Sequence, residues 1–259
     1  MYKSERAGDV QIHDGTVRYT PPTDYLGPDS FTYVITDGKD TDAARVTLRV
    51  LPTPEGKRPE PDTDEFEVRL GMESDFFPGM ESWLTELHGR ADFHYILGSV
   101  HWHISEYIDG FWKGDSMEFR KQYFCHLAES AETGLFDALS HPDLVKNFEP
   151  DSWDFETIRP VVAEALDRIA VTGVAMELNT SGLRKSYSEM NPGPEMLAMM
   201  AERNIPVVVG SDSHVPERVA AHFEDALGSL EQAGFEEVSV FKERQRSDLK
   251  IADVKESLC

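Results

Sequence analysis

The stretch Ile205-Pro-Val-Val-Val-Gly-Ser-Asp-Ser-His214 contains the pattern that decides the fold of this chain. Its apolar, β-branched first half predicts a buried strand. Asp212 and His214 follow that strand two residues apart, so on an extended backbone both side chains project from the same side. A strand that ends in a carboxylate and an imidazole is suited to hold a divalent metal ion or to relay a proton.

Three other predicted strands also end in residues that bind metals. They cover residues 66–72, 95–100 and 135–140, and they are followed by Glu73, His101 and His141. Four strand ends therefore supply carboxylates and imidazoles together, and this set of residue types indicates a metal site.

The rest of this region alternates between strands and helices. Helices are predicted over 80–88, 118–133, 156–172, 195–203 and 217–233, and further strands over 173–178, 205–210 and 237–241. The alternation implies parallel strands in an α/β barrel or an open sheet. Because the working groups of barrels lie at the C-terminal ends of the strands, the residues at these strand ends are expected to share one face.

The first part of the chain is all β instead. Alternating polar and apolar residues predict strands over 17–20, 30–35 and 44–50, with turns at Asp14-Gly15, Gly27-Pro-Asp29 and Asp37-Gly38. A proline-rich stretch follows these strands. The predicted organisation is a partial β segment over residues 1–51, an extended linker over 52–64 and an α/β domain over 65–259.

The composition is that of a globular protein with a strongly acidic surface. The 259 residues carry a formal net charge of −23, and this field repels nucleic acids and anionic membranes, so neither is an expected partner. Two cysteines without metal-type spacing favour a reducing compartment. No secretory pattern follows Met1 and no stretch is long and apolar enough to span a membrane, so a cytoplasmic location is expected.

Residues 8–51 resemble the second half of a bacterial cadherin-like, Ig-type repeat. The similar segments are Asp14-Gly-Thr-Val-Arg-Tyr-Thr-Pro21, Leu26-Gly-Pro-Asp-Ser-Phe-Thr-Tyr33 and Thr36-Asp-Gly38 with the strand that follows. Such repeats often bind calcium, for which Asp37, Asp40 and Asp42 would supply oxygen ligands; solvated turn acids are the alternative. Half a repeat lacks a second sheet, so an uncovered edge and an uncovered apolar face are expected.

Five segments of the α/β region resemble the histidinol-phosphatases of the polymerase and histidinol phosphatase (PHP) superfamily. In the family's order they are Gly71-Met-Glu-Ser-Asp-Phe-Phe-Pro-Gly79, Leu97-Gly-Ser-Val-His101, Ser140-His-Pro-Asp-Leu-Val-Lys146, Glu177-Leu-Asn-Thr-Ser-Gly-Leu-Arg-Lys185 and Gly210-Ser-Asp-Ser-His214. The resemblance covers residues 65–246. It implies a distorted (β/α)7 barrel that holds up to three divalent metals, Zn²⁺, Mn²⁺ or Fe²⁺.

The resemblance also implies which residues hold these metals. Glu73 would bridge two metals, and His101 and His141 would complete one of the two sites. Asp212 would bind the second metal and His214 would belong to the third. Asp212 and His214 are also the expected catalytic residues.

Further residues of these segments have expected roles around the metals. Arg184 and Lys185 are the expected phosphate ligands, since a guanidinium can hold a phosphate bidentately; an exposed surface pair is the alternative. His103 would point into the same site or stay outside it. Asp75 and Asp143 would orient metal ligands or serve as turn residues.

The beginning of the family pattern has no counterpart in this chain. The family begins with a strand ending in His-x-His and a second strand with a further histidine, whereas His13 is the one histidine before residue 88 here. We therefore expect a truncated barrel without its first two strands. Of the implied sites, that of Glu73, His101 and His141 keeps three protein ligands.

Two functions of different classes follow from these expectations. The first is a metal-dependent phosphomonoesterase that hydrolyses a small phosphorylated substrate, L-histidinol phosphate, to histidinol and phosphate in histidine biosynthesis, with activity limited by the missing ligands. The second is a catalytically inactive fusion or fragment that retains one metal site. A secreted adhesion protein and a polymerase-associated nuclease are less favoured, the nuclease because of the acidic charge.

Overall fold

The computed structural model describes residues 2–4, 9–13, 16–22, 27–36, 41–50 and 66–258. The chain divides into two compact units, one of Met1–Leu70 with His88–His94 and the other of Gly71–Leu87 with Tyr95–Cys259. The expected linker over 52–64 and the turns at Asp14-Gly15 and Asp37-Gly38 lie outside the described residues, as does Asp40. The division of the chain at residues 51 and 64 therefore stays a prediction.

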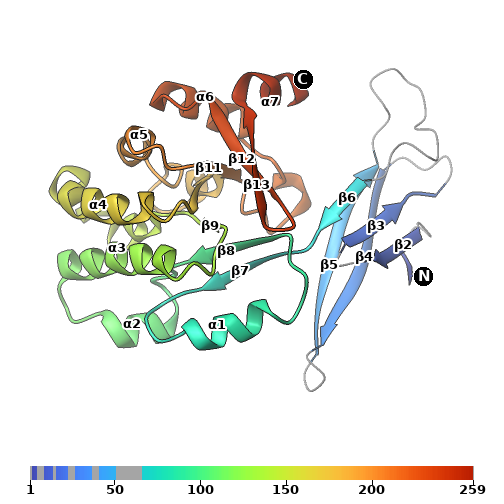
Figure 1. Ribbon diagram of the computed structural model, residues 1–259, viewed down its shortest axis with the longest axis horizontal. Coiled ribbons are helices and arrows are strands. Elements are labelled where there is room, and N and C mark those ends of the chain that lie inside the picture. Colours follow the sequence, from blue (N-terminus) through green and yellow to red (C-terminus); the bar gives the residue numbers. More distant parts are fainter. Residues whose placement is uncertain are drawn as a thin grey trace. The chain divides into compact units, whose positions relative to one another are not determined.

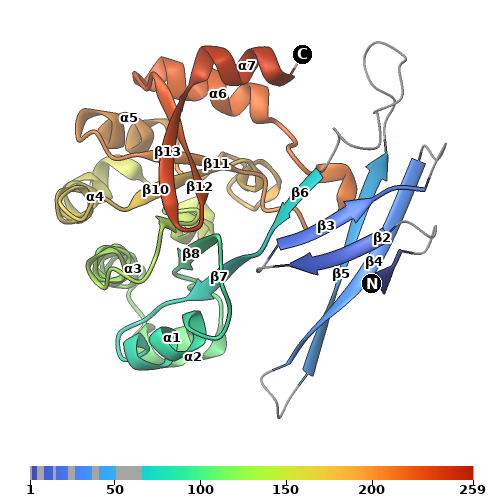
Figure 2. The ribbon, with the colours of Figure 1, turned by 45° about the vertical axis from the view of Figure 1, so that its right-hand side comes forward.

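The first unit is built from antiparallel strands (Figure 2). One sheet has the order β1-β2-β3-β6, and β4 pairs with β5 in a separate hairpin. The strands are β1 (Tyr2–Lys3), β2 (Asp9–His13), β3 (Thr16–Thr20), β4 (Gly27–Thr36), β5 (Thr41–Val50) and β6 (Phe66–Arg69). The three strands expected from the sequence are confirmed as β3, β4 and β5.

Two expectations for this unit are wrong. The predicted turn at Gly27-Pro-Asp29 is the first part of β4, where Gly27 pairs with Val50. Pro28 is tolerated there because β4 pairs with one strand in the described residues, and an edge strand can lack a donor. The strand predicted over 66–72 is two strands with different partners, since Phe66–Arg69 pairs with β3 and Gly71 begins a parallel sheet.

The second unit contains a parallel sheet with the order β11-β10-β9-β8-β7 (Figure 1). Its strands are β7 (Gly71–Asp75), β8 (Tyr95–Ser99), β9 (Ala138–Leu139), β10 (Ala175–Asn179) and β11 (Val207–Gly210). The sheet centre is fully buried, with Ile96, Leu139 and Met176 at most 1% exposed. The α/β class is confirmed, with five parallel strands in the described residues where the resemblance implied seven in a complete barrel.

Helices cover this sheet, and two of them begin at aspartate caps. They are α1 (Glu81–His88), α2 (Ser105–Phe111), α3 (Ser116–Glu132), α4 (Phe155–Ala170), α5 (Pro194–Glu202), α6 (Phe223–Ala233) and α7 (Ile251–Leu258). Asp115 caps α3 by accepting from the Glu118 amide at 3.0 Å, and Asp154 caps α4 through the Glu156 amide at 3.2 Å. None of the helices in the described part of the chain combines the length and hydrophobicity needed to cross a bilayer.

The helix predicted over 217–233 is interrupted. Pro216 opens a single 3₁₀ turn, Pro216–Arg218, and α6 starts five residues later at Phe223. Ala220 and His222 between them have positive φ values of 57° and 63°, a conformation that an α-helix excludes. The connection after Asp212 is therefore a loop with a short turn.

The strand predicted over 237–241 does not join the parallel sheet. β12 (Glu237–Lys242) pairs antiparallel with β13 (Gln245–Lys250), a strand that the sequence analysis missed. Arg244 in the connecting turn donates to both oxygens of Asp137 at 3.0 and 3.2 Å and to the Leu135 carbonyl at 2.9 Å. The hairpin is thereby fixed to the residues that precede β9.

Candidate metal centre

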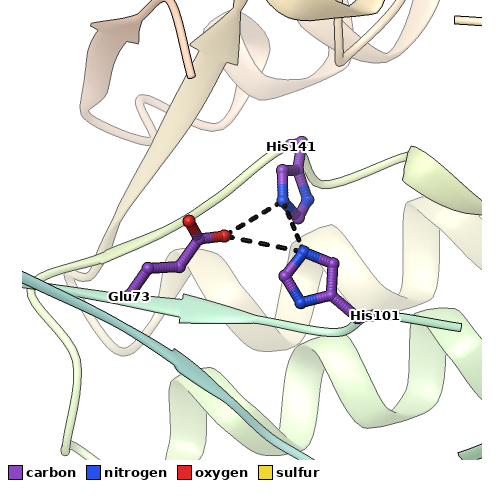
Figure 3. Close-up of side chains that lie close together, drawn as sticks. All are labelled: Glu73, His101 and His141. Atoms are coloured by element: carbon purple, nitrogen blue, oxygen red, sulfur yellow. Dashed lines mark hydrogen bonds and ion pairs between the residues drawn. The ribbon is translucent and has the colours of Figure 1, made fainter. Parts of the chain in front are cut away.

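Three side chains from adjacent strand ends meet at the C-terminal edge of the parallel sheet (Figure 3). Glu73 lies on β7, His101 follows β8 and His141 follows β9. Glu73 Oε1 lies 3.2 Å from His141 Nε2 and 3.6 Å from His101 Nε2, and the two Nε2 atoms are 3.1 Å apart. Three potential ligand atoms therefore face one point.

The spacing of these atoms fits a metal ion. A tetrahedral zinc ion with bonds of about 2.0–2.1 Å places neighbouring ligand atoms about 3.3 Å apart, close to the three distances found here. Two imidazole nitrogens and one carboxylate oxygen also suit zinc, manganese and iron. Three protein ligands leave one tetrahedral position free for water or substrate, which is the arrangement of catalytic rather than structural sites.

Neighbouring groups hold these ligands in place. Asp75 accepts a hydrogen bond from Nδ1 of His101, which leaves Nε2 of that ring as the metal-facing nitrogen. The Ser99 hydroxyl donates to Glu73 Oε1 at 2.5 Å. Burial raises the pKa of Glu73, but hydrogen bonds from His141 and Ser99 outweigh it and lower this pKa to about 2. Burial lowers the pKa of His101, and the bond to Asp75 raises it above its usual value. The Glu73 carboxylate can therefore bind a cation without first losing a proton.

Glu177 on β10 lies directly behind His141. Its Oε2 accepts hydrogen bonds from the His141 backbone N–H and from Asn179 Nδ2, both at 2.9 Å. Glu177 is 4% exposed, and burial raises the pKa of its carboxyl. The sequence analysis included Glu177 in a family segment but gave it no role, since contact with a backbone amide leaves no signal in the sequence.

Asp212 and Lys185 form a second group that is polar and partly buried. The Ser181 hydroxyl donates to Asp212 Oδ2 at 2.9 Å, and Lys185 Nζ lies 3.7 Å from the same oxygen. The charge of Lys185 also opposes protonation of His101 and lowers its pKa, although burial and Asp75 have larger effects. Lys185 therefore acts electrostatically on both Asp212 and the three-ligand site.

The three-ligand group of the described residues does not include Asp212 or His214. The His214 side chain is 85% exposed, and its Nδ1 lies 3.5 Å from Asp212 Oδ1. Arg184, at the end of the 3₁₀ turn Thr180–Arg184, is exposed. The site roles expected for these residues stay predictions, and so do those for Lys185.

The remaining candidates divide between the site and its support. The His103 ring stands edge-on to the His101 ring with centroids 5.1 Å apart, so it lies beside the three-ligand site. Asp143 is buried and accepts from Asn191 Nδ2 at 2.6 Å and from Lys146 Nζ at 3.0 Å. Asp143 therefore ties the turn after β9 to the segment that follows Lys185.

Comparison with known proteins gives a match for each part of the chain. Residues 2–49 match the bacterial Ig domain family, which confirms the Ig-type resemblance. Over 184 residues the chain is 38% identical to the "Probable histidinol-phosphatase" of Deinococcus radiodurans. This chain is a homologue of a histidinol-phosphatase. The alignment covers 65% of this chain and 65% of that relative, so the chain spans about two thirds of the relative's length.

A solved structure has a similar fold. It is the histidinol phosphate phosphatase of Lactococcus lactis, crystallised with zinc, L-histidinol and phosphate. The TM-score is 0.61 with 21% sequence identity, and the match covers 71% of this chain and 73% of that one. At this identity the comparison shows that the two folds are similar and shows nothing more.

Proposed function

We propose that this chain is a metal-dependent phosphomonoesterase that hydrolyses L-histidinol phosphate to histidinol and phosphate. The observation that carries the proposal is the convergence of Glu73, His101 and His141 at spacings of 3.1–3.6 Å in a homologue of a histidinol-phosphatase. The Lactococcus lactis protein of similar fold was crystallised with L-histidinol and phosphate, and we extend that substrate chemistry to this chain.

The three-ligand site of Glu73, His101 and His141 is called the triad below. The residues around it have separate proposed roles in such a reaction. A divalent ion held by Glu73, His101 and His141 would supply Lewis-acid polarisation of the phosphoryl group. Asp75 keeps the His101 ring in the tautomer that leaves Nε2 free. The ring of His101 therefore needs no rotation before it binds the ion.

Lys185 is the proposed anchor for the phosphate. Its ammonium lies 3.7 Å from Asp212 Oδ2 and faces the charges of the triad. The phosphate of the substrate would take the place of Asp212 as the partner of this ammonium. Arg184 is the proposed second phosphate ligand, and its guanidinium is exposed and available for bidentate binding. The overall charge of −23 disfavours nucleic acid as a substrate.

Asp212 and His214 are the proposed catalytic residues and further metal ligands. Ser181 fixes the Asp212 carboxylate, and the exposed His214 imidazole lies next to it. Imidazole is the side chain that most often transfers protons in catalysis. Because the product belongs to histidine biosynthesis, we propose a cytoplasmic location.

A second candidate function is a catalytically silent chain that retains one metal site. The observation that favours it is that Asp212 and His214 lie outside the three-ligand group of the described residues. The number of metals bound per chain separates the two candidates. A working enzyme of the proposed kind needs a second ion near Asp212, whereas a silent chain binds one ion at the triad.

The deciding experiment measures phosphate release from L-histidinol phosphate by the full chain with added Mn²⁺ or Zn²⁺. The H141A variant is the control because it removes one of three ligands. Turnover by the wild-type chain that is absent in H141A supports the phosphatase. Absence of turnover by a folded, metal-loaded wild-type chain rejects it in favour of the silent metal site.

A further inference from the structure

We infer that Glu177 is a positioning residue that sets the backbone of His141 and so aims its imidazole at the metal, and that Gly210 provides the space for it. The inference rests on the proposed metal-dependent function. It concerns residues on β10 and β11, the two strands that contribute none of the three triad ligands.

The backbone of His141 is in an unusual conformation. Its φ is +25°, outside the regions that residues with a side chain normally adopt. Such a conformation persists where the surroundings fix it. His141 is 2% exposed, and the partner of its buried N–H is Glu177 Oε2 at 2.9 Å. Without that acceptor the amide would be buried and unsatisfied, and the backbone would be free to relax.

Glu177 is itself held from two sides. Asn179 Nδ2 donates to the same Oε2 at 2.9 Å. On the other side, Oε1 lies against the Cα of Gly210, where a Cβ would come within 1.8 Å of Oε1 and 2.8 Å of Cδ. Gly210 lies next to this site because β10 and β11 are neighbours, with Asn179 paired to Gly210. A side chain at 210 would push the carboxylate off its position.

Glu177 acts through His141 rather than on the metal. The three-ligand group of the described residues does not include it, and its Oε2 already accepts from two N–H donors. Glu177 is therefore a buried carboxylate that lies beside the proposed metal site and supports one of its ligands without binding the metal. The orientation of His141, which follows β9, is therefore determined by a pair of residues on β10 and β11.

The test compares Co²⁺ binding by E177A, E177Q, G210A and the double variant E177A/G210A, using the visible absorption of the bound ion. Thermal unfolding of each metal-free protein is measured beside it. We expect E177A to weaken Co²⁺ binding by about 10- to 100-fold and to change the shape of the absorption bands. E177Q should stay near the wild type, because its side-chain oxygen can still accept from His141.

The double variant tests the role of Gly210. G210A should weaken Co²⁺ binding in the wild-type background and add little in the E177A background, where the clashing carboxylate is gone. D137A is the matched control, since Asp137 also accepts a backbone N–H on this sheet, from Ile96 at 2.8 Å. It should lower the unfolding temperature without changing the Co²⁺ spectrum.

Different outcomes overturn different claims. If the wild-type chain does not bind Co²⁺, the proposed metal centre fails and the inference fails with it. If the wild type binds Co²⁺ and E177A binds it equally well, the inference alone is wrong. Additive losses in E177A and G210A, or the same spectral change in D137A, also reject it. If E177A does not fold, G210A decides, because unchanged Co²⁺ binding there contradicts the steric argument.

Discussion

Asp75 accepts a hydrogen bond from Nδ1 of His101, and this leaves Nε2 of the same ring facing Glu73 and His141. The two residues come from neighbouring strand ends, since Asp75 closes β7 and His101 follows β8. The bond fixes both the tautomer and the rotation of a proposed metal ligand.

Replacing Asp75 by Ala should therefore weaken metal binding with little loss of fold stability. We expect the zinc affinity to fall by about 10- to 100-fold, because the ring loses the partner that orients it. Competition with a fluorescent zinc chelator measures this directly. An Asp75→Ala protein with unchanged zinc affinity would show that packing alone orients His101.

Metal binding at the triad should stabilise the folded chain. At a free zinc concentration about 100 times the dissociation constant, the gain in unfolding free energy is about 2.7 kcal/mol. Thermal unfolding with and without a chelator measures this effect as an increase in the unfolding temperature when zinc is bound. The increase should disappear in H141A; an equal increase in that variant would place the stabilising ion elsewhere.

Lys185→Ala should weaken phosphate binding. Loss of a charge-assisted hydrogen bond costs about 1.5–3 kcal/mol, and partial exposure of Lys185 places the effect at the low end, about tenfold in the inhibition constant of inorganic phosphate. Lys121→Ala is the matched control, since Lys121 lies on α3 and pairs with Glu118 at 3.5 Å. Equal effects of the two substitutions would remove Lys185 from the substrate site.

His126 should make the protein less stable in acid. Burial lowers its pKa, with a smaller opposing effect from Glu129, and Nδ1 lies 2.8 Å from the Tyr107 hydroxyl. The unfolded chain, in which a histidine has a pKa of about 6.5, then binds more protons than the folded one. The stability that neutral His126 contributes to the fold is therefore complete above about pH 6.5, the pKa of the unfolded state. It is lost as the pH falls toward the lower pKa that His126 has in the folded state.

The unfolding temperature at pH 7.5 and at pH 5.5, both with chelator, tests this. The decrease on acidification should be smaller in His126→Gln than in the wild type. His222→Gln serves as a control because His222 is exposed and its partner is Asp225 at 3.0 Å. A decrease in His126→Gln as large as in the wild type would assign the acid sensitivity to other groups.

Gly98→Ala should destabilise the sheet. A Cβ at this position would lie 2.5–2.8 Å from atoms of the Phe136 ring, which is itself buried. Overpacking of this kind costs about 1–3 kcal/mol. Gly110→Ala within α2 meets no atom within 4 Å, so it should gain about 0.5–1 kcal/mol from helix propensity. Denaturant unfolding of both variants measures the change in the free energy of unfolding, which should be a loss in Gly98→Ala and a gain in Gly110→Ala. A change of the same sign in both variants would contradict the packing argument.

The triad could be predicted from the sequence because its geometry follows from topology. Glu73, His101 and His141 each end a predicted strand, and parallel neighbouring strands bring their carboxyl ends to one edge. The positions at strand ends predicted a shared face, and the resemblance to the histidinol-phosphatases implied that these three residues form one site. Asp212 and His214 have the same kind of position, but Asp212 has a φ of +43°, so the alternation of an extended strand does not apply there.

Other features depend on partners that periodicity does not identify. Phe66–Arg69 reads as a strand in either unit, and its pairing with β3 could not be derived from its own residues. The β12–β13 hairpin lacks a sequence signal, since its turn residues Glu243 and Arg244 have positive φ values of 51° and 60° without any glycine or asparagine. The contact of Arg244 with Asp137 stabilises a conformation that local preference disfavours.

The ion pair between Arg244 and Asp137 joins residues 107 positions apart, whereas the parallel strands follow one another in chain order. During synthesis on the ribosome, each strand can therefore pair with the one made just before it. The beginning of β9 stays uncovered until residue 244 has left the exit tunnel, because its last contacts come from the hairpin. This end of the sheet is therefore completed late in synthesis, and long-range closure of this kind is slow.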